Sequence, residues 1–259
     1  MPRVNQLLAR GISEIVALAR HGASPRDGFR VLMYHAVGTP ADQDRLNLYC
    51  ISKELFASHA AALAAYRGAA IVDLSKHAGT TDGMRVAVTF DDGYRDNLLQ
   101  AAPILQRYGI PFTVFVCTGF VQRKDPRFLS AAEIRELAAM PGVTIGSHAV
   151  SHRRLTEMGD SEVMEELTAS KRFLEDATGR EVSRLSYPHG AVDRRIRDAA
   201  AAAGYTIGAC SRFDINGPLR DPMLLSRTSV HGADSVRVLC QKLHGDWDWY
   251  RWRSTDPAA

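Results

Sequence analysis

The chain has 259 residues, of which 46% are hydrophobic and 24% are charged, and its formal net charge is +3 at pH 7. This composition is typical of a globular protein with a full-sized core, and the small net charge argues against a nucleic-acid partner. The four cysteines are widely spaced and form no Cys-x-x-Cys pair, which excludes a zinc finger, a dithiol redox motif and a dense disulfide framework.

We find no internal repeat, low-complexity segment or linker, so residues 1–259 are expected to form one domain. Its expected parts are an N-terminal helix within 1–28, a core of about 30–243 and an aromatic C-terminal tail at 244–259. No apolar run approaches the ~18 residues of a membrane span, and the first residues lack the features of a secretory signal. We therefore expect a cytoplasmic protein.

The N-terminal helix is amphipathic over residues 4–20, because its large apolar side chains fall on one side. We expect this side to pack on the core. The alternative is a helix lying on a membrane surface, with Arg3, Arg10 and Arg20 on its polar side.

Short apolar strands then alternate with helices along the chain. The predicted strands are 29–34, 69–72, 86–89, 112–117, 143–145, 184–186, 205–210 and 224–230. The predicted helices are 52–66, 94–108, 130–140, 161–177, 193–203 and 234–243. This alternation indicates an α/β fold with a parallel sheet and right-handed crossovers, as a closed or nearly closed barrel.

Polar residues follow several of these strands, where functional groups gather in such folds. They are His35, Asp91, Asp92, His148, Tyr187, Pro188, His189 and Asp214. A barrel would bring them together at one mouth.

Asp91 and Asp92 are adjacent carboxylates between a buried strand and Gly93. Consecutive side chains diverge at a strand end, so one carboxylate can bind a metal while its neighbour faces substrate. The alternative interpretation of an isolated Asp-Asp-Gly is a polar turn that caps the next helix.

His148 and His152 are four residues apart, which brings two imidazoles together on a turn or tight loop. Two histidines and one carboxylate form the usual set of a catalytic zinc site or a related divalent metal site. Two surface histidines are the alternative, and the preceding Asp91-Asp92-Gly93 makes that coincidence less probable.

These residues resemble a known family. Thr89-Phe90-Asp91-Asp92-Gly93 and Ser147-His148-Ala149-Val150-Ser151-His152 are similar to the first two motifs of polysaccharide deacetylases, the nodulation-deacetylase homology domain or carbohydrate esterase family 4. Val31-Leu32-Met33-Tyr34-His35 also resembles the first strand of many members.

The resemblance implies a distorted (β/α) barrel of about seven parallel strands and a metal-dependent hydrolase that removes N-acetyl groups from an N-acetylated sugar, oligosaccharide or polysaccharide precursor. By motif match, Asp92, His148 and His152 would bind the divalent metal and Asp91 would be the catalytic base. The expected ion is Zn²⁺, with Co²⁺ or Ni²⁺ as alternatives.

The third family motif, Arg-x-Pro-Tyr, is altered here. The matching stretch places Ser186 at the Arg position and His189 at the Tyr position. We hypothesise that Arg227, on the last predicted strand, replaces the missing Arg beside the base.

Tyr187-Pro188-His189-Gly190 resembles a branch that acts in exopolysaccharide and lipid-linked sugar pathways. Peripheral membrane contact through a lipid-linked substrate is therefore a further expectation. With Arg227, we place His35, Tyr187, Pro188 and His189 among the substrate-binding residues.

The fourth motif is not recognisable, and Asp214 is a weak substitute for it. Ser229-Val230-His231 is similar to the fifth motif, which supplies the general acid, so His231 is the candidate acid. His189 and His35 compete for this role, and a surface His231 is the plain alternative.

Two other functions stay open. One is a deformylase or deacetylase of a lipid-linked aminosugar, and the other is an inactive carbohydrate-binding relative, which the missing third-motif Arg permits. The aromatic residues of the tail are expected to pack against the barrel, although sugar rings also stack on such side chains.

Overall fold

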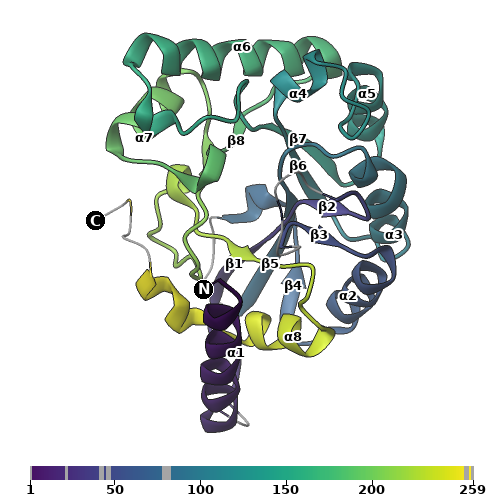
Figure 1. The fold of residues 1–259 in the computed structure, drawn as a ribbon, viewed down its shortest axis with the longest axis vertical. Coiled ribbons are helices and arrows are strands. Elements are labelled where there is room, and N and C mark those ends of the chain that lie inside the picture. The colour runs from purple at the N-terminus through teal and green to yellow at the C-terminus, as the bar shows by residue number, and fades with distance from the viewer. Residues whose placement is uncertain are drawn as a thin grey trace.

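The computed structural model describes the backbone of residues 2–20, 23–40, 44, 48–77, 83–253 and 257, and their side chains except those of 2–7 and 253. A curled parallel sheet forms its centre, with helices around the outside (Figure 1). The strand order is β10-β1-β5-β6-β7-β8-β9, and all of these pairings are parallel. The strands are β1 (Gly28–Tyr34), β5 (Met84–Phe90), β6 (Phe112–Val116), β7 (Val143–Ser147), β8 (Arg184–Ser186), β9 (Ile207–Ala209) and β10 (Thr228–Ser229).

The two ends of this sheet meet. A parallel bridge joins Ala209, in β9, to Leu225, three residues before β10. The sheet is thus a distorted barrel, and the prediction of about seven parallel strands in a (β/α) barrel is confirmed. An eighth strand, β4 (Ala69–Ile71), pairs with the first half of β5, while β6 pairs with the second half. The short strands β2 (Ala36–Val37) and β3 (Cys50–Ile51) form a separate parallel pair.

Apolar side chains cover both faces of the barrel strands. In β1, Leu32 and Tyr34 belong to the large cluster between sheet and helices, whereas Phe29 and Val31 belong to a smaller cluster with Phe115. Burial on both faces explains why these strands are nearly continuous apolar runs in the sequence.

Two helices begin where their capping serines predict. Ser52 caps α2 by accepting a hydrogen bond from the Leu55 amide, and Ser130 forms a capping box with Glu133 before α5. The helices are α1 (Pro2–Ala19), α2 (Lys53–Ala65), α3 (Ala102–Gln106), α4 (Thr118–Gln122), α5 (Ala131–Ala139), α6 (Asp160–Thr178), α7 (Arg194–Ala202) and α8 (Val236–His244). The predicted helix from residue 94 is a π-helical turn, Asn97–Ala101, followed by α3.

The last predicted strand is shorter than expected. Residues 222–224 form a 3-10 turn, Leu225 makes only the bridge to Ala209, and the paired strand β10 is limited to Thr228–Ser229. The prediction of a strand over 224–230 was therefore too long.

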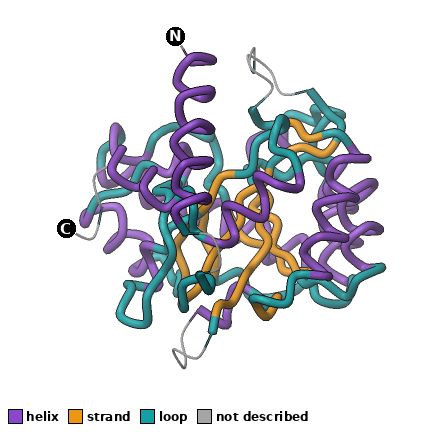
Figure 2. Tube along the Cα trace, turned by 90° about the horizontal axis from the view of Figure 1, so that it is seen from below, coloured by secondary structure: helices purple, strands orange, loops and turns teal. Residues whose placement is uncertain are grey.

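The N-terminal helix α1 (Pro2–Ala19) corrects another expectation. Its side chains Leu8, Ile12, Ile15 and Leu18 are 43–74% exposed instead of packing on the core. The helix contacts the rest of the chain through small and charged residues. Ala9 and Ser13 are buried, the Trp249 indole N–H donates to Ser13 Oγ (3.0 Å), and Arg10 Nη2 donates to the Ala233 carbonyl oxygen (2.8 Å). Because the small side is the one that docks, the large apolar side stays uncovered, and the N-terminal end extends away from the body (Figure 2). The side chain of Arg3 and those of the other residues up to 7 lie outside the described set.

The aromatic tail packs as expected over most of its described length. Trp247, Trp249 and Tyr250 form a cluster with Ala9 and Phe213, whereas Trp252 is 80% exposed. Residues 254–256, 258 and 259 of the predicted tail lie outside the described residues. Within the described chain, none of the helices has the length and apolar character that crossing a membrane requires.

Candidate active site

A cavity of about 1380 Å³ opens at the carboxyl ends of the strands. Predicted site residues from five separate segments reach it: His35 after β1, Asp91 and Asp92 after β5, His148 and His152 after β7, His189 after β8, and Arg227 and His231 around β10. Aromatic and cationic side chains complete the lining. They include Tyr49, Tyr94, Phe120, Arg123, Lys124, Arg127 and Phe128.

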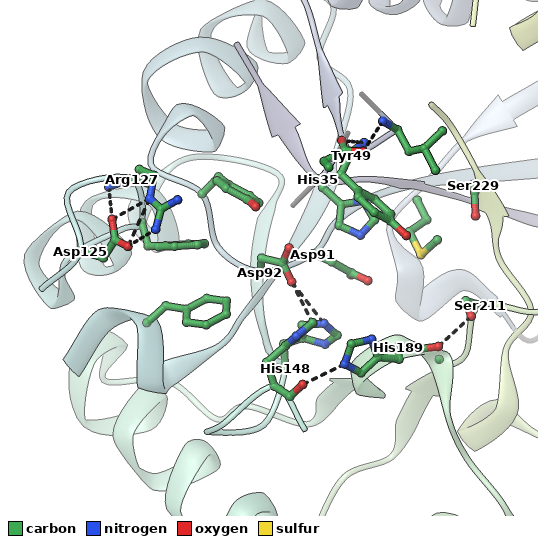
Figure 3. Close-up of a pocket in the computed structure, with 18 of the residues that line it drawn as sticks. His35, Tyr49, Asp91, Asp92, Asp125, Arg127, His148, His189, Ser211 and Ser229 are labelled. Atoms are coloured by element: carbon green, nitrogen blue, oxygen red, sulfur yellow. Dashed lines mark hydrogen bonds and ion pairs between the residues drawn. The ribbon is translucent and has the colours of Figure 1, made fainter. Parts of the chain in front are cut away.

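Asp92, His148 and His152 form a compact cluster on the cavity floor. Figure 3 shows Asp92 and His148 facing each other there. One ligand atom from each residue lies within 4.8 Å of the others. Asp92 Oδ1 is 3.5 Å from His148 Nε2 and 3.3 Å from His152 Nε2. This oxygen is buried and makes no hydrogen bond of acceptable geometry to any described residue. An orphaned carboxylate oxygen facing two imidazole nitrogens is the donor set that a divalent transition metal prefers, so these residues fit a metal.

The backbone is bent where these ligands are presented. Asp92 (φ 73°) and His152 (φ 60°) both adopt left-handed conformations, which non-glycine residues rarely do. Next to Asp92, Gly93 (φ 78°) runs so close to β6 that a Cβ would lie 3.0 Å from Val116. Strained residues of this kind concentrate at functional sites, because the surrounding structure must hold them in place.

Neighbouring groups orient both imidazoles. His148 Nδ1 lies 2.7 Å from the Ser186 carbonyl oxygen, to which it donates, and this leaves Nε2 free to face Asp92. Burial lowers the pKa of His148 to about 4, so this ring is neutral at pH 7, as a metal ligand must be. The ring of His152 contacts the rings of Phe120 (5.8 Å between centroids) and His189 (4.6 Å).

Asp91 has different surroundings. Arg227 donates two hydrogen bonds to its carboxylate, from Nη1 to Oδ1 (2.7 Å) and from Nη2 to Oδ2 (2.8 Å). Ser186 Oγ donates to Asp91 Oδ2 (3.2 Å) and accepts from Arg227 Nη2 (2.9 Å). Burial acts to raise the pKa of Asp91, but the Arg227 guanidinium and the His148 ring hold the pKa of this carboxyl well below its usual range. Asp91 is therefore ionised at neutral pH, and Arg227 lies beside it, in the position that our hypothesis for the missing Arg requires.

His231 is held through its backbone. Its amide donates to Asp234 Oδ2 (2.8 Å), and this carboxylate also accepts from the buried Lys242 ammonium (2.5 Å). The imidazole lines the cavity. Burial, helped by the Lys242 charge, lowers the pKa of His231 to about 4.

Two predicted substrate-binding residues do not reach the cavity. Tyr187 is fully buried and its hydroxyl donates to the Met223 carbonyl oxygen (2.9 Å), and Pro188 is also buried. The side chains pack into the fold because the turn after β8 directs only His189 outward, in a left-handed conformation (φ 58°). Tyr187 and Pro188 thus shape the turn, and the prediction that they contact substrate is not supported by their position. Asp214 lies outside the cavity lining and pairs with Arg212.

Some site residues were not anticipated. Ser186 was noted only as the residue at the position of the missing Arg. The motif match gave no indication of its hydrogen bonds to Asp91 and Arg227. Lys242 lies within a helix whose pattern shows no reason for a buried ammonium. The aromatic and cationic wall of the cavity comes from the segment after β6, where the sequence offers no motif.

Residues 78–208 match the family model for polysaccharide deacetylase. YxkH of Bacillus subtilis (strain 168), named for the polysaccharide deacetylases, is 31% identical over 123 residues, which cover 48% of this chain and 43% of YxkH. Peptidoglycan-N-acetylglucosamine deacetylase PgdA of Listeria monocytogenes is 28% identical over 162 residues, covering 62% of this chain and 33% of PgdA. The chain thus spans less than half the length of these relatives.

Solved structures show the same fold. The Streptococcus pyogenes deacetylase PplD has a TM-score of 0.73 at 23% identity, covering 85% of this chain and 99% of PplD. IcaB from Ammonifex degensii also has a TM-score of 0.73, at 25% identity, with coverage of 85% and 98%.

Proposed function

Since this chain belongs to the polysaccharide deacetylase family, we propose that it hydrolyses N-acetyl groups from a saccharide with the help of a divalent metal at Asp92, His148 and His152. Zn²⁺ is the ion that best suits two imidazoles and one carboxylate with positions left for water and substrate.

One observation carries this proposal. The two adjacent carboxylates after β5 have separate environments, because Asp92 faces the imidazoles while Asp91 is bound by Arg227 and Ser186. A pure binding protein needs no second, oriented carboxylate beside its metal ligands. A hydrolase needs one, to take the proton from the attacking water.

The metal, when bound, would polarise the amide carbonyl and make water more acidic. The chain's own groups would do the rest. Asp91 accepts the water proton, and its bidentate pairing with Arg227 fixes the direction of the accepting lone pairs. His148 keeps its ring plane through the bond from Nδ1 to the Ser186 carbonyl.

His231 would protonate the leaving amine. With a pKa of about 4, its imidazole is neutral at pH 7 and carries a single N–H. To act as the acid, the ring must first take up a second proton from solvent. Negative charge that develops beside it in the transition state would favour this protonation, and the imidazolium would then give that proton to the leaving nitrogen. His231 thus fits an acid that acts late in the reaction.

Acetate release from N-acetylglucosamine oligomers tests the proposal. We expect metal-stripped protein to be inactive, zinc or cobalt to restore activity, and Asp91→Asn to abolish it with the metal still bound. Absence of metal binding in the wild type would overturn the metal site. Metal binding without release from any N-acetylated saccharide would overturn the deacetylase assignment.

A further inference from the structure

One wall of the cavity is cationic. It is formed by residues 123–128, which follow α4, and contains Arg123, Lys124 and Arg127 against one carboxylate, Asp125. Arg127 binds Asp125 through Nη2 to Oδ2 (2.5 Å) and Nε to Oδ1 (3.0 Å), so this pair is neutral. The hydrogen bonds from Arg127 are the main cause of the lowered pKa of Asp125, and Arg123 adds only a smaller electrostatic contribution. Neither Arg123 nor Lys124 forms an ion pair with a described residue. Two positive charges of this wall are therefore in excess.

The other carboxylates that line the cavity have partners of their own. Asp91 is bound by Arg227, and Asp92 faces His148 and His152. Asp44 accepts from the amides of residues 48 and 49, at 2.8 and 2.7 Å. Figure 3 places the Asp125–Arg127 pair on one side of Asp91 and Asp92, with Tyr49 on the other. None of the described carboxylates that line the cavity forms an ion pair with Arg123 or Lys124.

An aromatic row connects this wall to the metal cluster. The Arg123 guanidinium carbon lies 4.9 Å from the centroid of Phe120, whose ring is 5.8 Å from that of His152. Phe128 stacks beside Phe120 (4.4 Å between centroids). Aromatic faces of this kind suit the apolar face of a sugar ring, so a saccharide lying along the row would bring its next substituent to Arg123 and Lys124.

We propose that Arg123 and Lys124 form an anion-binding subsite beside the catalytic cluster, and that the substrate is an N-acylated saccharide carrying a phosphate or carboxylate group near the acylated sugar. This inference rests on the proposed function. Two adjacent cations at a partly closed cavity bind anionic oxygens through charge-assisted hydrogen bonds, which are stronger than those of neutral donors.

The test uses three substrates of equal length: a neutral N-acetylglucosamine oligomer, one with a neighbouring uronic acid, and one with a phosphate ester on the terminal sugar. Wild type should prefer one or both anionic substrates, and the better one identifies phosphate or carboxylate as the group bound. Arg123→Gln/Lys124→Gln should raise KM for that substrate about tenfold and leave kcat within about twofold. KM for the neutral oligomer should stay within about twofold.

The matched control is Lys53→Gln/Arg107→Gln, which removes the same charge at two exposed positions outside the cavity lining. It should leave all three substrates unchanged. Binding of the same saccharides to the Asp91→Asn protein, measured by calorimetry, separates this subsite from turnover. Equal affinity for neutral and anionic saccharides, or an equal loss for both in the double variant, would overturn the subsite. If the wild type releases acetate from none of the three, the proposed function itself fails.

Discussion

The two carboxylates after β5 are neighbours in sequence and opposites in environment. Both oxygens of Asp91 accept hydrogen bonds, two in total from Arg227 and one from Ser186. Asp92 has a buried oxygen that no described residue satisfies, in a backbone conformation that costs free energy (φ 73°). The hydrogen bonds of Asp91 fix the orientation of its carboxylate. The unpaired oxygen of Asp92 is explained if a bound ligand supplies the missing interaction.

Backbone geometry creates this difference. Asp91 continues the hydrogen bonding of the sheet, since its amide donates to the Tyr34 carbonyl (3.0 Å). The left-handed conformation of Asp92 then directs its own side chain toward His148 and His152, which follow β7. Adjacent residues thus reach opposite sides of the floor without any long loop.

Asp91→Asn should have the largest effect of the variants that test the difference between Asp91 and Asp92. We expect kcat to fall by about 10²–10⁴-fold, since the amide cannot accept the water proton. Metal content should stay at the wild-type level, because Asp91 is not among the clustered ligand atoms. Steady-state kinetics with metal analysis on the same sample checks both.

Asp92→Asn is the matched variant, with the same change one residue along. It should lose metal together with activity. Loss of metal in Asp91→Asn as well would show that the two carboxylates share one role.

The contribution of the Asp91–Arg227 ion pair can be tested through the free energy of unfolding. Arg227→Met leaves the Asp91 carboxylate buried without its partner, which should lower the free energy of unfolding by about 3–5 kcal/mol. Adding Asp91→Asn should recover part of that loss, because the uncompensated charge is then gone. Denaturant unfolding of the two single variants and the double variant measures this coupling.

Arg184→Met is the control for this experiment. Arg184 pairs with Asp73 at 2.8 Å, but both side chains are partly exposed, so its loss should cost only about 0–1 kcal/mol. If Arg227→Met is no worse than Arg184→Met, the Asp91–Arg227 pair does not stabilise the fold.

Sequence alone predicted the elements that carry a strong local signal. Strands buried on both faces appear as continuous apolar runs, and helices capped by Ser52 or Ser130 begin where the caps predict. The packing side of α1 could not be predicted, because amphipathicity shows which face is apolar and not whether anything covers it. The structure docks the small face instead.

The residues of the site also differ in how well the sequence predicted their positions. The predictions for the residues that follow β5 and β7 agree with the cavity lining, since the parallel topology alone brings Asp91, Asp92 and His148 to one edge. Arg227 lies 136 residues from Asp91, and its proximity depends on how the barrel closes beside β9. The prediction that Tyr187 contacts substrate is not supported, because a motif match gives the position of a residue in the chain and not the direction of its side chain.

The pH dependence of stability extends the comparison to His231. Burial holds its folded pKa at about 4, below the ~6.5 of an unfolded chain. The unfolded state therefore binds the proton first, and stability should fall as pH drops from about 6.5 to 4. His231→Gln should remove up to about 1.4 kcal/mol per pH unit of that slope in metal-stripped protein. An unchanged slope in chemical unfolding at stepped pH would show that His231 is not held neutral.

Ser186 gives the smallest and most selective change, because it contacts Asp91 and His148 through different atoms. Its Oγ contacts Asp91 and Arg227, whereas its carbonyl oxygen accepts from His148. Ser186→Ala removes only the first set, so we expect a loss of about 1 kcal/mol in stability, a modest fall in kcat and no change in metal affinity. Metal titration alongside unfolding would separate these effects. A weaker metal site in Ser186→Ala would mean that the hydroxyl also supports the position of His148, and that the two halves of the floor are coupled.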